Sequence, residues 1–176
     1  MNLSSEIKDN KIILLITPKE KYHKELLNTL KVMEKGTDKT CYVCINEPYN
    51  FVVDNLKKNN IPAEKFFFID ALTAKVQTPP SVDDCIFVSA PNALTEISLA
   101  FSKAFDEKKC NGLLFDTLST LLVYANPHSI IQFIHNVLTK LRVVSGKAVF
   151  VALKEDVNSE LVKDLYMFVD KVVEVK

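Results

Sequence analysis

Short apolar runs alternate with longer amphipathic segments along the chain. The apolar runs predict strands at Ile12–Thr17, Cys41–Ile45, Phe66–Ile69, Ile86–Ser89, Leu113–Asp116, Ala148–Leu153 and Val169–Val175. Several of these runs are continuously apolar, which is typical of strands covered by helices on both faces. The segments between them have helical spacing with one buried face. These predicted helices are Lys19–Lys35, Pro48–Asn59, Pro91–Lys108, Pro127–Ser145 and Asn158–Phe168.

Turn residues agree with this division of the chain. Gly36 and Gly146 follow predicted helices, where a glycine is typical of a left-handed cap. Strands that alternate with helices of this length predict βαβ units. We therefore expect an α/β fold with a doubly wound, mostly parallel sheet and helices on both faces. No linker or internal repeat interrupts the pattern, so residues 1–176 are predicted to form a single domain.

Composition narrows the classes of function. The 176 residues include 48% hydrophobic and 25% charged residues, with 22 basic and 22 acidic side chains, as in an ordinary soluble globular protein. Non-specific binding to nucleic acid depends on an excess of basic side chains that neutralise phosphates. Arg142 is the one arginine, so bidentate recognition of phosphate or guanine has almost no candidates. The sequence predicts no nucleic-acid partner.

Several features of the sequence predict a cytoplasmic protein. The segment before the first predicted strand is short and polar, without the pattern of a signal peptide. No apolar run approaches the roughly 20 residues of a membrane helix. Four cysteines without a secretory signal favour free thiols in a reducing compartment. Cys41 and Cys44 form a CxxC inside a predicted strand, where residues three apart point to opposite faces. They are interpreted as buried structural thiols.

Polar residues gather where the predicted strands end. In open parallel sheets, ligands bind beyond the carboxyl ends of the strands. The polar residues there are Thr17, Asn46, Glu47, Asp70, Ser89, Asp116, Thr117, Glu155 and Asp156. If Asp70, Asp116 and Glu47 came together, their oxygen atoms could hold a hard cation such as Mg²⁺. The alternative is that these acids form turns and cap helices.

One segment, Gly112–Leu122 (GLLFDTLSTLL), carries a specific resemblance. An apolar run that ends in an acid followed by Thr is how many nucleotide-hydrolysing α/β proteins present the carboxylate that organises their metal ion. Together with KIILLIT as first strand and CYVCINEP as second strand, the chain resembles the RecA-like ATPases, a three-layer α/β sandwich, and particularly archaeal proteins similar to the clock protein KaiC. The resemblance implies that Asp116 is the Walker B acid, which acts on the metal through water. It implies that Glu47 is the acid that polarises the attacking water.

The chain departs from that family at its phosphate loop. The loop GxxxxGK followed by Ser or Thr wraps phosphates with bare backbone amides, but this chain reads TPKEKYHKE from Thr17 to Glu25. A proline removes one amide donor, and bulky side chains crowd a turn that needs glycine. Lys19, Lys24 and Thr17 remain the candidates for holding a phosphate near the helix N-terminus. The alternative is a solvated helix start that is rich in lysine.

These observations favour a catalytically degenerate RecA-like domain that binds a protein partner, a second copy of itself included, without cofactor. The alternative is an unorthodox nucleotide-binding ATPase that uses ATP and Mg²⁺ through Asp116 and Glu47. A third class, a phospho-acceptor domain similar to response-regulator receivers, also displays a central Asp. Its acidic pair after the first strand is replaced here by Thr17 and Pro18.

Overall fold

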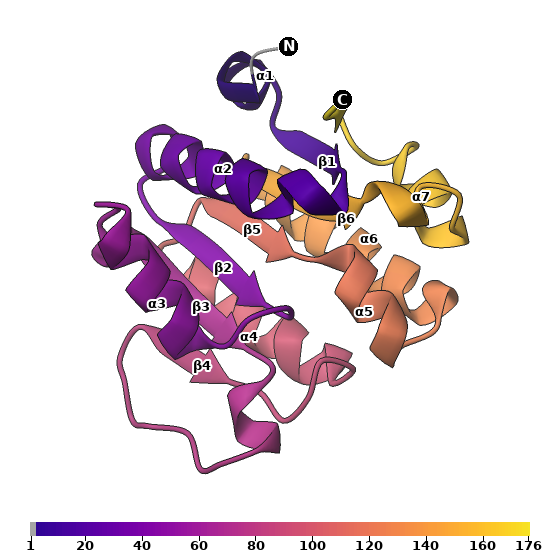
Figure 1. The fold of residues 1–176 in the computed structure, drawn as a ribbon. Coiled ribbons are helices and arrows are strands. Elements are labelled where there is room, and N and C mark those ends of the chain that lie inside the picture. The colour runs from indigo at the N-terminus through magenta and orange to yellow at the C-terminus, as the bar shows by residue number, and fades with distance from the viewer. Residues whose placement is uncertain (1–2) are drawn as a thin grey trace.

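Parallel strands form one seven-stranded sheet in the computed structural model, which describes residues 3–176 (Figure 1). Their order across the sheet is β4-β3-β2-β5-β6-β1-β7. The strands are β1 Ile12–Thr17, β2 Thr40–Cys44, β3 Phe66–Asp70, β4 Cys85–Phe87, β5 Gly112–Asp116, β6 Lys147–Leu153 and β7 Lys171–Glu174. The predicted strands and the α/β class are confirmed.

Helices cover both faces of this sheet (Figure 1). On one face pack α1 Leu3–Asp9, α2 Tyr22–Gly36 and α3 Tyr49–Lys58, and on the other pack α4 Leu94–Asp106, α5 Leu118–Tyr124, α6 Pro127–Val143 and α7 Glu160–Leu165. Four short 3-10 turns accompany them: η1 Lys19–Lys21, η2 Ala63–Lys65, η3 Thr73–Lys75 and η4 Lys154–Asp156. The sequence pattern missed α1 and α5, and it placed the start of α4 too early. None of the helices in the described part of the chain is long and apolar enough to cross a bilayer.

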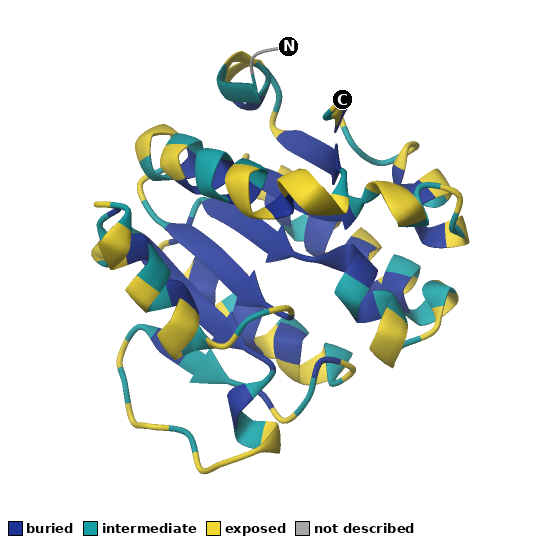
Figure 2. Ribbon diagram, viewed as in Figure 1, coloured by how far each residue is buried: buried dark blue, intermediate teal, exposed yellow. Residues whose placement is uncertain are grey.

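The central strands are buried on both sides (Figure 2). Cys41 packs in the cluster beneath α4–α7, whereas Cys44 packs in the cluster beneath α1–α3. This confirms that the two thiols point to opposite faces. All four cysteines are buried and free, and burial raises the pKa of each thiol. Thiols protected in this way are poor nucleophiles.

The carboxyl ends of β2 and β5 lie side by side at a switch point of the sheet. Cys44 pairs with Asp116 in the register of these two strands. After β2 the chain enters α3 on one face, and after β5 it enters α5 on the opposite face. Where neighbouring connections diverge in this way, open α/β sheets usually bind their ligands.

The predicted glycine caps are wrong. No glycine of the described chain has a positive φ, whereas Ser145 has φ 54° directly before Gly146. Gly36 is itself the last residue of α2, and both the amide and the hydroxyl of Thr37 donate to the carbonyl oxygen of Met33. The threonine closes the last turn of α2, so no left-handed residue is needed there.

Two glycines allow a matched test of packing. A Cβ on Gly112 would lie 2.7 Å from Cγ2 of Thr37 and 2.9 Å from Oγ1 of Thr40, whereas a Cβ on Gly36 meets nothing within 4 Å. The two threonine hydroxyls are 2.7 Å apart and hold each other in place. We expect Gly112→Ala to lower the free energy of unfolding by about 1–3 kcal/mol. Gly36→Ala should raise it by about 0.5–1 kcal/mol, because glycine is unfavourable in a helix. Urea denaturation of both variants measures this, and equal effects would contradict the packing at Gly112.

Candidate functional site: a buried carboxylate beneath the first turn of α2

Asp116 ends β5 on the face covered by α2, and its side chain is fully buried. The hydroxyl of Tyr22 donates to Oδ1 at 2.6 Å, and the hydroxyl of Tyr42 donates to Oδ2 at 2.7 Å. Tyr22 is the first residue of α2, and Tyr42 is the central residue of β2. Both carboxylate oxygens therefore accept from the protein itself.

The hydrogen bonds continue outward over the carboxyl ends of β2 and β5. The side-chain amide of Asn46 donates to the hydroxyl oxygen of Tyr22 at 3.0 Å. The hydroxyl of Thr120 in turn donates to Oδ1 of Asn46 at 3.0 Å. These five residues, Tyr22, Tyr42, Asn46, Asp116 and Thr120, are called the Asp116 network below. Three of its donors form a series: Thr120 on α5 donates to Asn46 in the β2–α3 loop, Asn46 donates to Tyr22, and Tyr22 donates to the buried carboxylate.

Burial sets the electrostatics of this network. Loss of water raises the pKa of Asp116 to about 6, even though the two tyrosine hydrogen bonds favour the ionised form. Burial, and then the nearby charge of Asp116, raise the pKa of Tyr22 and of Tyr42 well above the usual range. Both phenols therefore stay protonated donors at neutral pH. Burial also raises the pKa of the half-buried Glu47, while the charge of His23 opposes that rise.

Asp70, at the end of β3, has a separate set of partners. Its Oδ2 accepts from the amide of Tyr49 at 2.7 Å and from the hydroxyl of Thr73 at 2.6 Å. Its Oδ1 accepts from the amides of Leu72 and Thr73, at 2.7 Å and 2.8 Å. Asp70 thus fixes both the start of α3 and the turn η3. This is the turn-forming and capping role that the sequence left open as an alternative.

The structure does not gather the three acids into one site. Asp116 and Asp70 each accept hydrogen bonds from their own neighbours, and Glu47 takes part in neither set. Among residues 3–176, no group of three or more His, Cys, Asp or Glu side chains is arranged to hold a metal ion. The metal-binding roles of Asp116 and Asp70, and the catalytic roles of Asp116 and Glu47, stay predictions.

The junction between β1 and α2 is short and tightly turned. Thr17 is buried, Pro18 is extended, and η1 leads directly into Tyr22. Lys19 and Lys24 are exposed on this turn and the helix that follows it. The turn places an aromatic ring over the end of β5, with its hydroxyl on Asp116. Phosphate binding by Thr17, Lys19 and Lys24 stays a prediction.

Sequence reasoning missed both tyrosines of the network. Tyr42 lies in a continuously buried strand, TCYVC, and a buried phenol hydroxyl needs a hydrogen-bond partner. The neighbouring strand ends in Asp116, so the pairing of Tyr42 with an acid could have been inferred. Tyr22 had no such signal, because its position depends on the path of η1.

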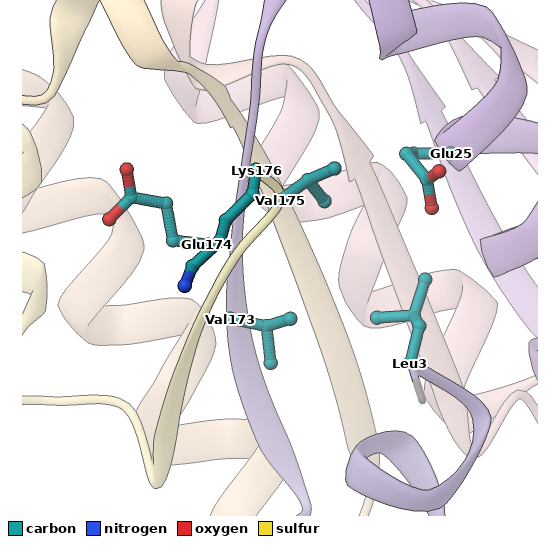
Figure 3. A pocket seen from close by; sticks show the side chains of 6 residues that line it. All are labelled: Leu3, Glu25, Val173, Glu174, Val175 and Lys176. Atoms are coloured by element: carbon teal, nitrogen blue, oxygen red, sulfur yellow. The ribbon is translucent and has the colours of Figure 1, made fainter. Parts of the chain in front are cut away.

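A cavity of about 500 Å³ lies elsewhere, between α1, α2 and the edge strand β7 (Figure 3). Its lining side chains are Leu3, Glu25, Val173, Glu174, Val175 and Lys176. None of them belongs to the Asp116 network, so the size of this cavity is no guide to the chemistry at the end of β5.

A family model matches residues 14–175, which is nearly the whole chain. The chain belongs to DUF7504, a family of unknown function. No curated protein matches this DUF7504 member in sequence.

Solved structures resemble the DUF7504 fold at low sequence identity. A KaiC-like protein of Pyrococcus horikoshii, PH0186, aligns with a TM-score of 0.62 and 8% identity over 93% of this chain and 70% of its own. An uncharacterised protein of the same organism, PH0321, solved with an unknown peptide, aligns with a TM-score of 0.66 and 11% identity over 95% and 78%. The flagellar accessory protein FlaH of Methanocaldococcus jannaschii gives a TM-score of 0.57 and 12% identity over 99% and 76%. These likenesses confirm the RecA-like fold and nothing finer.

The buried carboxylate predicts a pH-dependent stability. The pKa of Asp116 is about 6 in the folded protein against 3.8 for an unperturbed Asp, so the folded state binds this proton more tightly than the unfolded chain. The stabilising contribution is therefore full below about pH 4 and is lost as the pH rises through 6. Its size is about 3 kcal/mol. Relative to wild type, Asp116→Asn should gain this amount in unfolding free energy between pH 4 and pH 7.5.

Urea denaturation over a pH series measures that difference. The matched control is Asp83→Asn, on the exposed loop before β4. A difference between wild type and Asp116→Asn that does not change with pH would contradict the desolvated carboxylate.

The hydrogen bonds of Asp70 predict an effect on stability that does not depend on burial of a charge. Replacement by Asn keeps the shape but turns part of the acceptor into a donor that faces backbone amides. We expect Asp70→Asn to lower the free energy of unfolding by about 2–4 kcal/mol, since buried amides lose their partners. Asp83→Asn serves again as the control. A loss no larger than that of the control would show that Asp70 does not hold α3 and η3.

Proposed function

We propose that this chain is a RecA-like domain that does not carry out conventional ATP hydrolysis and acts as a regulatory or protein-interaction module. Its partner is another protein, a second copy of the chain included. The observation that carries the proposal is the hydroxyl of Tyr22, 2.6 Å from the carboxylate of Asp116. Asp116, the predicted Walker B acid, is therefore hydrogen-bonded to α2. By the resemblance, α2 is the helix that follows the phosphate loop.

The carboxylate of Asp116 supports the proposal through its partners. A Walker B acid acts on a hydrated Mg²⁺, and Mg²⁺ keeps most of its water when it binds to proteins. Asp116 is fully buried, and both of its oxygens accept from phenol hydroxyls. To admit a hydrated ion, the network must open and leave buried hydroxyls without partners, at about 1–3 kcal/mol for each unsatisfied group.

The junction after β1 gives independent support. Pro18 has no amide to offer a phosphate, and the turn contains no glycine that would let the backbone approach one closely. Glu20 and Glu25 add negative charge near the start of α2, where phosphate would have to lie. Binding of the metal ion and binding of the phosphates, the two requirements of a nucleotide site, are thus both unfavourable.

Support for the interaction role comes from the fold neighbours. PH0321 was solved in complex with an unknown peptide, so a protein of similar fold binds peptide. The buried, free thiols of this chain suit a reducing cytoplasm. The balanced charge of the chain suits a protein partner better than nucleic acid.

Calorimetric titration with ATP and Mg²⁺, together with light scattering, tests the proposal. We expect no saturable heat at millimolar nucleotide, because the network occupies Asp116 and the glycine loop is missing. Light scattering reports whether the 19.9 kDa chain is a monomer or associates with itself.

Saturable binding at micromolar ATP that is lost in Asp116→Asn would overturn the proposal in favour of an unorthodox ATPase. The same variant must keep the wild-type mass and circular dichroism, so that loss of binding cannot be a loss of fold.

A further inference from the structure

A groove of about 400 Å³ opens at the carboxyl edge of the sheet, between segments that follow β2, β3 and β5. Three segments form its walls: the start of α3 with Pro48 and Asn50, the turn η3 with its flanking residues, and the end of α5 with Tyr124. It is a different place from the cavity beside β7. It is also separate from Asp116, because no residue of the Asp116 network lines it.

The groove exposes apolar side chains. Val76 is 83% exposed and Tyr124 is 37% exposed, and both line it. Next to lining residues along the chain, Phe51 is 55% exposed and Val123 is 79% exposed. The loop that follows η3 is largely exposed in Figure 2. Exposed apolar side chains that gather at one edge of a fold are typical of an interaction surface.

A single cation determines the charge of the groove. Lys75 is the one charged residue of its lining, and its ammonium lies 4.8 Å from the centre of the Tyr124 ring. No Asp or Glu lines the groove, and Lys75 takes part in none of the ion pairs between residues 3 and 176. A carboxylate that reaches this ammonium would meet an unpaired positive charge on an aromatic face.

Hydrogen bonds at the ends of the strands hold the walls of the groove in place. Asp70 accepts from the amides of Tyr49 and Leu72, so it ties the α3 wall to the η3 wall. The hydrogen bond from Thr120 to Asn46 ties α5 to the β2–α3 loop. A groove whose walls are already fixed loses little conformational freedom when it binds.

We propose that this groove is the docking site of a protein partner that offers a short segment with a carboxylate next to a large apolar side chain. The carboxylate pairs with Lys75, and the apolar side chain packs between Leu72, Val76 and Tyr124. The inference rests on the proposed interaction role and specifies the chemistry of the partner. It adds a role for Asp70, and for Asn46 and Thr120 of the Asp116 network, which act as positioning residues for the groove.

The test uses two small probes, acetyl-Asp-Leu-Phe-amide and acetyl-Lys-Leu-Phe-amide, in ¹⁵N-edited NMR titrations of the full chain. The acidic probe should shift amide signals of Asn50, of residues 72–77 and of Tyr124. It should bind about two- to five-fold more tightly than the basic probe, as expected for one exposed charge pair.

A charge reversal sharpens the test. Lys75→Glu removes an exposed cation without opening the core, and it should invert the preference between the two probes. The matched control is Lys103→Glu, an exposed lysine on α4, which should leave the preference as in wild type. Spectra of the free variants that match wild type away from the substitution show that both remain folded.

Three results would overturn the inference: equal binding of both probes, shifts centred on the cavity beside β7, or no shifts at millimolar probe. Self-association that Lys75→Glu abolishes would overturn the choice of occupant, because the groove would then bind a second copy. Failure here is distinguishable from failure of the proposed function. Nucleotide binding in calorimetry would overturn the proposed lack of ATP hydrolysis but not the docking role of the groove. Loss of the probe preference would overturn only that docking role.

Discussion

The structure depends on how a carboxylate is satisfied when it is buried at the end of a central strand. Asp116 has no contact with solvent, so each of its oxygens needs a donor from the protein. Tyr42 supplies one from the neighbouring strand, and Tyr22 supplies the other from the first turn of α2. This requirement fixes the path of the chain after β1, because η1 must lead the ring of Tyr22 over the end of β5. The same hydroxyl accepts from Asn46, so the constraint extends to the β2–α3 loop and to α5.

A second buried acid organises the other half of the same edge. Asp70 collects three backbone amides and one hydroxyl, and it sets the start of α3 against η3. Asp70, together with the hydrogen bond from Thr120 to Asn46, holds the loops that border the groove at Lys75. The chain, a DUF7504 member, has a RecA-like fold, and its two buried acids at the carboxyl edge accept hydrogen bonds from the protein itself.

The sequence predicts the layers of this fold well, because continuous apolar runs such as IILLIT leave little choice but a strand buried on both faces. It also places Asp116 and Asp70 at the correct edge. It fails where local chemistry competes with a general rule: Thr37 closes α2 in place of a glycine, and Ser145 takes the left-handed conformation beside Gly146. It fails again at Tyr22, since contact between residues 94 positions apart depends on the crossover from β1 to α2. The strand ends alone leave a shared cation site and separate turn-forming roles open for the acids, because they do not show which amides and phenols each acid accepts from.

Our central proposal is that the carboxylate of Asp116 accepts hydrogen bonds from phenol hydroxyls and does not act on a metal ion. The most direct measurement is the carboxyl ¹³C resonance of Asp116 during titration with Mn²⁺ and ATP, since a paramagnetic ion broadens the signal of a ligand that it approaches. We expect this resonance to stay sharp at stoichiometric Mn²⁺, and its chemical shift to titrate with the Asp116 pKa of about 6 when the pH is varied. Selective broadening of this resonance at stoichiometric Mn²⁺, reversed by excess Mg²⁺, would contradict it.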